Sequence, residues 1–483
     1  MNDKSIRVNY IYNLAFQILA VLLPLITTPY ISRVLGAGNI GIYSYSDSLT
    51  GFFLMFASLG ILSYGSREIA RAQDSREERS QLFWEMMAFK FWAVVLSYSS
   101  FFVFLYTIDV KNRIILGLLS LNFLTSLLDL SWFFRGMERF KQLSLRNMGV
   151  KLIGAASTFA VVRSERDLPI YVLCAVLPGL VGNILLWRTA LREVDRVPLR
   201  QLRIFRHLKP ILVFFIPAVS VQIYHTLDKL MLQWIVKDNY ENGYYDQAYK
   251  IVTILLTVLT SYNGVMFSRM SNLYRHGDKA KAEEHINRAI PFVLMLGFPM
   301  TVGLAVVAKR FVPVFFGEGY DQVVLLLQMF CPLILITGLS NFVANVFLIP
   351  AGKQGKSNIA IVAGAATNIV CNLLLIPRFC ALGACLATVI SELVILEIMC
   401  FFQKGVTRQL LKAMKKYLVA ALLMGVITFM VDWLMPDALS VAQNTLVIAC
   451  LVVVGVIVYF GALLVWKDNC VIELLPARLK KGH

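Results

Sequence analysis

The chain has 483 residues, of which 58% are hydrophobic and 16% are charged. These values exclude an ordinary soluble enzyme, because globular chains are roughly 45–50% apolar and about 25% charged. They also exclude a disordered chain, which needs low hydrophobicity. The net charge of +17 is typical of nucleic-acid binding in a soluble protein, but in a membrane protein it must first be compared with the topology.

Apolar blocks of roughly 18–25 residues follow one another along the chain, and each can cross a membrane as a helix. We therefore predict an all-α polytopic membrane protein with about fourteen transmembrane helices. In chain order the expected ranges are 10–32, 40–64, 84–107, 114–134, 146–162, 168–187, 211–236, 247–268, 289–308, 323–349, 357–376, 382–402, 417–434 and 445–466.

Basic residues alternate between the loops on the two sides. With the N-terminus inside, 34 of the 46 Lys and Arg residues fall in segments assigned to the cytoplasm. Because Lys and Arg concentrate in cytoplasmic loops, both termini are expected in the cytoplasm. The net charge is therefore mainly a topology signal, and we do not expect a nucleic acid as a partner.

The longest loop joins the sixth and seventh predicted helices, over 191–209. It combines basic residues with apolar Leu199, Leu202, Phe205 and Leu208. This pattern suits a helix that lies on an anionic inner leaflet. A solvated, positively charged loop explains the sequence equally well, so both alternatives stay open.

Two parts of the sequence are similar at a constant spacing of 202 residues. The spacing relates Gly41 to Gly243, Tyr43 to Tyr245, Ser66 to Ser268 and Arg67 to Arg269. We predict two parallel six-helix bundles, as in transporters that work by alternating access. The predicted domains are a bundle at 1–190, a basic linker at 191–209, a second bundle at 210–403, and a terminal helix pair with a cytoplasmic tail at 404–483.

Charges inside the predicted helices are candidate functional residues, because burying a charge in the bilayer costs roughly 2.5–3.5 kcal/mol on insertion scales. Lys229 and Lys250 can face a cavity, or they can pair with Asp228 and Asp246. Asp129 and Glu392 can carry protons or cations, although a local ion pair with Lys90 or a helix end is the simpler explanation. Three arginines close predicted helices and are candidates for the same path or for simple interfacial anchoring: Arg33, Arg67 and Arg269.

Several chemistries find no support in the sequence. The run 352–357 ends in Gly-Lys-Ser, but Pro350 stands where a phosphate loop needs Gly, so ATP is not an expected ligand. The eight cysteines form neither a zinc motif nor a disulfide framework. No metal or other cofactor is predicted. We expect no enzyme, and energy would come from a membrane gradient such as H⁺ or Na⁺, or from the gradient of the substrate.

Ordered motifs within residues 10–400 resemble the Wzx-type flippases. These belong to the polysaccharide transporter branch of the multidrug/oligosaccharidyl-lipid/polysaccharide exporter (MOP) superfamily, with MATE and MurJ as other branches. The run that matches the family's Pro-Arg-x-Ser segment has Ser268 in place of Pro. The motifs are Pro29-Tyr30-Ile31-Ser32-Arg33-Val34-Leu35-Gly36, Gly65-Ser66-Arg67-Glu68, Asp129-Leu130-Ser131-Trp132-Phe133-Phe134-Arg135-Gly136, Leu227-Asp228-Lys229-Leu230, Gly243-Tyr244-Tyr245-Asp246-Gln247-Ala248-Tyr249-Lys250 and Met266-Phe267-Ser268-Arg269-Met270-Ser271.

The resemblance implies translocation of undecaprenyl-pyrophosphate-linked oligosaccharide repeat units across a bacterial plasma membrane. It also implies a MATE-like fold, contact with membrane lipids, and the polysaccharide polymerase machinery as a partner. By family position the cations that would bind the pyrophosphate are Arg33, Arg67, Lys229, Lys250 and Arg269. Asp228 would orient Lys229, while Asp129 and Glu392 remain candidates for ion coupling.

Three alternatives compete with this interpretation. A MurJ-type lipid II flippase shares the expected fold and head group. A MATE-type drug/cation antiporter would need an acidic cavity, whereas the core here carries lysines. A polysaccharide polymerase or ligase would need a large external loop, and the external loops have only about 3–14 residues, which disfavours it.

Overall fold

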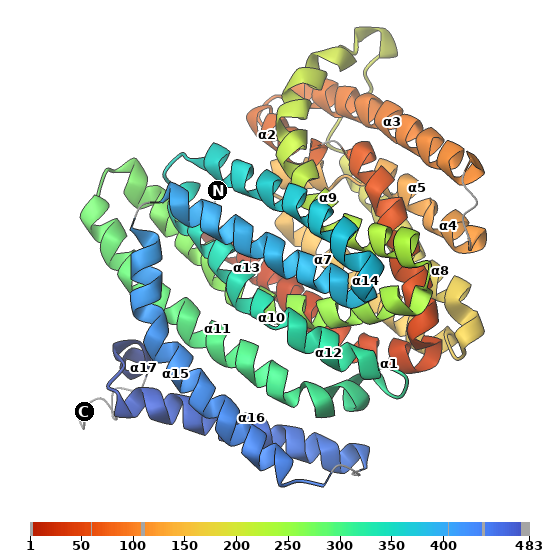
Figure 1. The fold of residues 1–483 in the computed structure, drawn as a ribbon. Helices are drawn as coiled ribbons and strands as arrows, with labels where there is room; N and C mark the ends of the chain where they lie inside the picture. The colour runs from red at the N-terminus through yellow and green to blue at the C-terminus, as the bar shows by residue number, and fades with distance from the viewer. Residues whose placement is uncertain (1–2, 59, 108–111, 404, 437–439, 475–483) are drawn as a thin grey trace. The chain divides into compact units, whose positions relative to one another are not determined.

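The computed structural model describes residues 3–58, 60–107, 112–403, 405–436 and 440–474, and the described part is helical throughout. Part of the predicted cytoplasmic tail lies outside the described residues. Within these described ranges, ten helices are long and apolar enough to cross a membrane, which confirms an all-helical polytopic membrane protein. Figure 1 labels the helices.

All fourteen expected ranges fall on helical segments. The number of candidate spans is nevertheless smaller than fourteen, because some neighbouring ranges lie on one continuous helix and two helices are not counted as spans. α1 (Asp3–Ser58) and α14 (Gln354–Phe402) each run through two expected ranges. α1 is broken at Gly36, where φ is 74°, a conformation that glycine adopts readily. α14 is broken at Cys380, three residues after Pro377. α7 (Phe140–Val161) and α9 (Leu208–Val236) are helical but are not among the ten.

The remaining expected ranges match one helix or a short series of helices. The first series is α4 (Arg113–Leu119), α5 (Leu121–Leu128) and α6 (Ser131–Gly136), and the second is α12 (Asp321–Phe330), α13 (Pro332–Phe342) and the π-helix η4 (Val343–Leu348). The single helices are α2 (Ile61–Arg71), α3 (Arg76–Thr107), α8 (Leu168–Ala190), α10 (Asn239–Arg275), α11 (Lys279–Phe316), α15 (Val406–Trp433) and α16 (Val441–Val465). The short α17 (Asn469–Leu474) follows the last expected range.

The chain forms two compact units. Unit 1 comprises residues 1–234 and 238–243, and unit 2 comprises residues 235–237 and 244–483. α9 is thus grouped mainly with unit 1, although the sequence repeat assigns it to the second bundle. The bundle boundaries rest on the helix order and the repeat, and they stay a prediction.

Close helix packing in unit 1 depends on two glycines of the quoted motifs. A Cβ on Gly65 would lie 2.9 Å from Trp132, and a Cβ on Gly136 would lie 2.7 Å from Ile69. α2 and α6 therefore approach more closely than side chains would allow. Ser66 adds a hydrogen bond of 3.1 Å to the Trp132 carbonyl.

The loop between α8 and α9 is held against unit 1. Its backbone contains only the short 3₁₀ turns η2 (Leu199–Gln201) and η3 (Ile204–His207), so the surface helix, one of the two alternatives, does not form. Arg76 binds Asp195 through two nitrogens, at 2.8 and 2.9 Å. Trp84 donates to the Asp195 carbonyl at 2.9 Å. These contacts fix the loop to the start of α3.

The terminal helices of unit 2 are fastened by a buried arginine. Arg310, on α11, pairs with Asp432 near the end of α15. Its guanidinium also donates to the carbonyls of Met435 (3.2 Å) and Pro436 (3.0 Å) and to Asn444 Oδ1 on α16 (3.1 Å). One side chain thereby satisfies carbonyl groups that end a helix and ties α11 to the terminal pair.

Candidate functional site

Arg67, on α2, lies in a network of polar contacts at one end of unit 1. Its guanidinium pairs with Glu68 at 2.9 Å and lies 5.4 Å from the centre of the Tyr64 ring. The arginine side chain is 43% exposed. A cation that is half exposed and held by one carboxylate and one ring can still contact an anionic group, since guanidinium has several donors.

The network continues from Tyr64 into the interior of the same unit. The Tyr64 hydroxyl and His207 Nδ1 are 2.8 Å apart, and His207 Nε2 is 2.7 Å from Glu85. Glu85, on α3, is fully buried and also accepts from Arg206 at 2.5 Å and from the Arg203 backbone N–H at 2.9 Å. The contacts therefore link α2, which carries Arg67, to α3 and to the loop before α9.

Two glycines that the sequence repeat relates lie against each other in unit 1. A Cβ on Gly41 would lie 1.7 Å from the Asn239 carbonyl oxygen. A Cβ on Gly243 would lie 2.1 Å from the Ala37 carbonyl oxygen. The backbone of α1 and the first turn of α10 are thus in direct contact, which explains why both repeat copies have Gly at this position.

The predicted pair Asp228 and Lys229 lies near the end of α9. Asp228 is buried, whereas Lys229 is partly exposed. The Lys229 carbonyl accepts a hydrogen bond of 2.9 Å from Asn242, which also reaches Gln233 at 3.3 Å. Asn242 therefore fixes the segment that carries the pair to the first turn of α10. A buried carboxylate inside a membrane unit is a functional candidate by default.

Asp129 is engaged in local contacts where α5 ends. Its carboxylate accepts from Ser131 and pairs with Arg146, on α7, at 3.1 Å. Lys90, buried on α3, donates to the Asp129 backbone carbonyl at 2.7 Å rather than to the carboxylate. The contacts of Asp129 thus match the alternative of a local ion pair, but the pairing cation is Arg146 and not Lys90. Its part in ion coupling stays a prediction.

In unit 2, Lys250 pairs with Asp246 one helical turn earlier, at 3.3 Å, and remains 37% exposed. This is the ion pair that the sequence offers as the alternative to a cavity role. Beside it Tyr245 stacks with Tyr249, and both contact Phe330. Tyr245 and Phe330 are buried, so this aromatic cluster packs the interior of unit 2, and of the three rings only Tyr249 is partly exposed.

Glu392, on α14, is buried and accepts from Ser340 at 3.4 Å. The same helix carries the buried Asn368 and Asn372, whose side chains are joined by a hydrogen bond of 3.0 Å. Thr388 contacts the Tyr245 hydroxyl at 3.1 Å. Uncharged oxygens together with one carboxylate can coordinate a hard cation, and no group of three or more His, Cys, Asp or Glu in the described residues is arranged for a metal.

The remaining predicted residues are exposed side chains on long helices. Arg33 lies on α1 before the break at Gly36, and Arg269 lies on α10. In the second copy of the repeat Met270 stands where the first copy has Glu68, so the carboxylate that holds Arg67 has no counterpart beside Arg269.

Sequence reasoning missed several polar residues that the structure brings together. Glu85 stands at the edge of a predicted helix and His207 stands in a loop, so neither was counted as a buried group. Arg146 was assigned to the positive-inside signal. The asparagines were overlooked because only charges were sought inside the helices, although Asn368 and Asn372 repeat at the four-residue spacing that puts side chains on one helix face.

Comparisons with known proteins identify the family. The family described as "Polysaccharide biosynthesis protein" matches residues 6–274, and the family described as "Lipid II flippase MurJ" matches residues 157–450. A protein of Escherichia coli K12 described as "Putative O-antigen transporter" is 25% identical over 416 residues, which are 84% of this chain and 98% of that protein. The lipid II flippase MurJ of Bacillus subtilis is 24% identical over 48% of this chain and 45% of that protein.

Solved structures show the fold. The structure of lipid II flippase MurJ in an inward closed conformation has a TM-score of 0.75 at 15% identity and covers 95% of this chain and 99% of that one. An inward-facing MATE transporter of the MOP superfamily has a TM-score of 0.63 at 13% identity and covers 83% and 99%. The expected MurJ/MATE-like fold is confirmed. Because the first family matches more than half of the chain, the chain belongs to the polysaccharide biosynthesis protein family, whose matched relatives are transporters rather than enzymes.

Proposed function

We propose that the protein translocates a lipid-linked oligosaccharide repeat unit, carried on undecaprenyl pyrophosphate, from the cytoplasmic to the outer leaflet of a bacterial plasma membrane. The product would serve synthesis of a surface polysaccharide such as an O-antigen, a capsule or an exopolysaccharide. The observation that carries the proposal is the match to an O-antigen transporter over 84% of this chain and 98% of that protein.

The finer architecture is part of the proposal. Fourteen transmembrane helices form two six-helix bundles and a terminal pair, and both termini face the cytoplasm. The helical segments over all fourteen expected ranges support the helix number. The distribution of Lys and Arg supports the orientation. The two bundles open alternately to the two sides of the membrane, as other transporters built from repeats do.

The cations bind the anionic head group in this mechanism. Arg67 and Lys250 are each partly exposed, so phosphate oxygens can approach both cations. Arg33, Lys229 and Arg269 extend the same path by family position. Asp228 orients Lys229.

Coupling to H⁺ or Na⁺ is assigned to buried carboxylates. Glu392 is the strongest candidate, because it is buried and the uncharged hydroxyl of Ser340 contacts its carboxylate. Asp228 is the second, since it is buried beside a lysine. Asp129 is the weakest, because Arg146 and Ser131 already occupy its carboxylate.

The test is deletion of the gene followed by analysis of polyprenyl-linked intermediates. Loss of this protein should leave the undecaprenyl-pyrophosphate-linked repeat unit in the cytoplasmic leaflet and stop polymer at the surface. Complementation with the full chain should restore polymer. A strain without the gene that still makes normal polymer would contradict the proposal.

A lipid II flippase is the second candidate. It is favoured by the family match over residues 157–450 and by the TM-score of 0.75 to a MurJ structure. The same deletion separates the two, because accumulation of lipid II with arrested cell-wall synthesis would identify a MurJ-type activity. Accumulation of a different polyprenyl-linked glycan, with normal growth of the wall, would identify repeat-unit export.

A further inference from the structure

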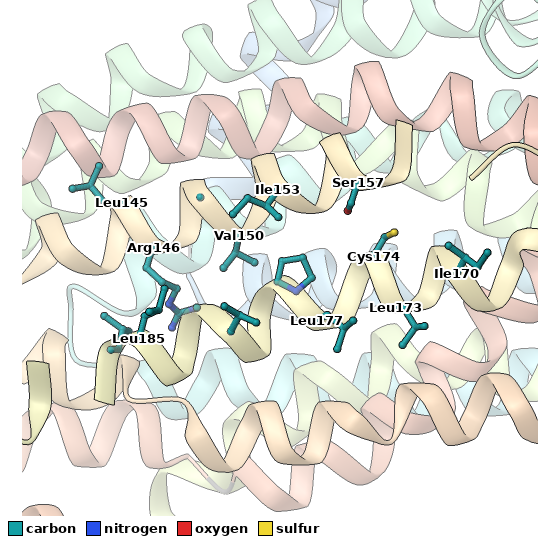
Figure 2. A pocket seen from close by; sticks show the side chains of 15 residues that line it. Leu145, Arg146, Val150, Ile153, Ser157, Ile170, Leu173, Cys174, Leu177 and Leu185 are labelled. Carbon is teal, nitrogen blue, oxygen red and sulfur yellow. The ribbon is translucent and has the colours of Figure 1, made fainter. Parts of the chain in front are cut away.

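An apolar groove of about 580 Å³ runs between α7 and α8 in unit 1. Its lining is aliphatic along both helices, and Leu145, Ile153, Leu177, Val181 and Leu185 are all exposed by 40% or more. Figure 2 shows these two helices side by side with their side chains converging on the space between them. The volume is that of an ordinary small-ligand site, and this one is open along its side.

Two glycines shape the groove in opposite ways. A Cβ on Gly182 would lie 2.6 Å from Val150, so this glycine lets α7 and α8 approach each other. Gly149, on the facing helix, has no atom within 4 Å of an added Cβ. Gly149 therefore leaves open space in the wall of the groove rather than making a helix contact.

The length of the groove matches one leaflet of a bilayer. On α7 it extends from Leu145 to Ser157, which is about 18 Å at 1.5 Å per residue. The hydrocarbon core of a membrane is about 30 Å thick, so one leaflet is about 15 Å. A single acyl chain of a phospholipid spans this distance. An undecaprenyl chain is far longer than the groove.

Basic side chains lie near both ends of the groove, but at the end near Ser157 and Ile170 the exposed Arg163 and Arg166 are accompanied by the acidic Glu165 and Asp167. At the opposite end, Arg188 follows Leu185 by three residues and so continues the groove-lining face of α8, and Lys141 precedes Leu145 by four residues on α7. Both are exposed. Inside the same end, Arg146 points from α7 into the space between the helices (Figure 2), and its Nε is buried with no hydrogen-bond partner among the described residues. The lining at the other end, near Ser157 and Ile170, carries no charge.

We propose that this groove binds one anionic phospholipid of the cytoplasmic leaflet. One acyl chain lies along α7 and α8, and the head-group phosphate contacts Arg188 and Lys141. The proposal uses the orientation given under the proposed function, which puts the end of the groove with Lys141 and Arg188 in the cytoplasmic leaflet, but it does not depend on the transported substrate. Cationic residues at that depth favour an anionic head group by about fivefold each.

The test counts lipids that stay bound to the full chain. The protein is reconstituted in bilayers of equal parts phosphatidylethanolamine and phosphatidylglycerol, and retained lipids are counted by native mass spectrometry. Gly149→Leu fills the groove and should retain one phosphatidylglycerol fewer than the wild type. Gly117→Leu is the matched control, because Gly117 lies on α4 of the same unit and also has no atom within 4 Å of an added Cβ. It should retain the wild-type number.

A second variant tests the head-group contact. Arg188→Gln combined with Lys141→Gln should still retain a lipid but lose about 25-fold of the preference for phosphatidylglycerol. Equal lipid counts in Gly149→Leu and the wild type, or equal retention of both lipids by the wild type, would overturn the proposal. Replacement of the phospholipid by an added polyprenyl phosphate would overturn it in favour of a substrate-tail site. Because lipid counting involves no transport, a negative result in this assay is distinct from a negative result in the export test.

Discussion

Gly41→Ala tests the backbone contact between α1 and the first turn of α10. The added Cβ would lie 1.7 Å from the Asn239 carbonyl oxygen and 2.9 Å from the Gly243 nitrogen. All of these atoms are backbone, so one helix must move. Overpacking of this kind typically costs 1–3 kcal/mol, against a gain of about 1 kcal/mol from replacing Gly by Ala in a helix. We expect a cost at the upper end of this range and hence a net loss of stability of about 2 kcal/mol, since no flexible side chain can yield.

The measurement is the thermal unfolding midpoint of the detergent-purified full chain, followed by size-exclusion chromatography. Gly51→Ala is the matched control, because Gly51 lies on the same helix and has no atom within 4 Å of an added Cβ. Its midpoint should stay the same or rise. Gly243→Ala should fall with Gly41→Ala, since its Cβ would lie 2.1 Å from the Ala37 carbonyl oxygen. If Gly41→Ala unfolds at the same temperature as Gly51→Ala, the close approach of the two helices is refuted.

Three further predictions concern buried charges and the proposed path. Glu85→Ala should expose the loop at 191–207 to trypsin, because it removes the common partner of Arg206, His207 and the Arg203 backbone N–H, at a cost of about 1–3 kcal/mol for a buried group left unsatisfied. Glu85→Gln should protect the loop partly, and equal cleavage of wild type and Glu85→Ala would disprove the anchoring role. Arg310→Gln should release the terminal helix pair and speed proteolysis after α14. An unchanged digestion pattern would show that α15 and α16 stay packed without the contacts of Arg310. Replacing both Arg67 and Arg269 by Ala should abolish polymer export while the protein stays inserted, and normal export would remove both residues from the path.

The sequence predicted the helices well because hydropathy is a property of consecutive residues. The expected range 114–134 nevertheless corresponds to three short helices, α4, α5 and α6; the extended backbone of Asp129 (ψ 119°) separates α5 from α6, whereas Ser120, between α4 and α5, keeps helical dihedrals. The break at Cys380 matches the boundary expected between 376 and 382. The loop at 191–209 could not be decided from sequence, because an amphipathic pattern suits a lipid surface and a protein surface equally.

The candidate residues were found from the sequence, but their partners were not. Charge and hydropathy predicted that Lys90, Asp129, Asp228 and Lys250 lie within helices, which is correct for all but Asp129, the extended residue after α5. The cation beside the Asp129 carboxylate proved to be Arg146 rather than Lys90. Sequence spacing identifies neighbours only within one helix, as for Asp246 and Lys250. Contacts between helices require knowledge of which helices are adjacent.

The sequence by itself determined the membrane class, the helix ranges and the transporter family, because each follows from local composition or from ordered motifs. Only the tertiary structure decided that Glu85 holds the loop residues Arg206 and His207, and that Gly41 meets the first turn of α10. In a lipid environment the apolar side chains of a helix are similar on all faces. The hydrophobic pattern therefore does not show which face packs against protein, and a few small and polar residues determine the helix contacts.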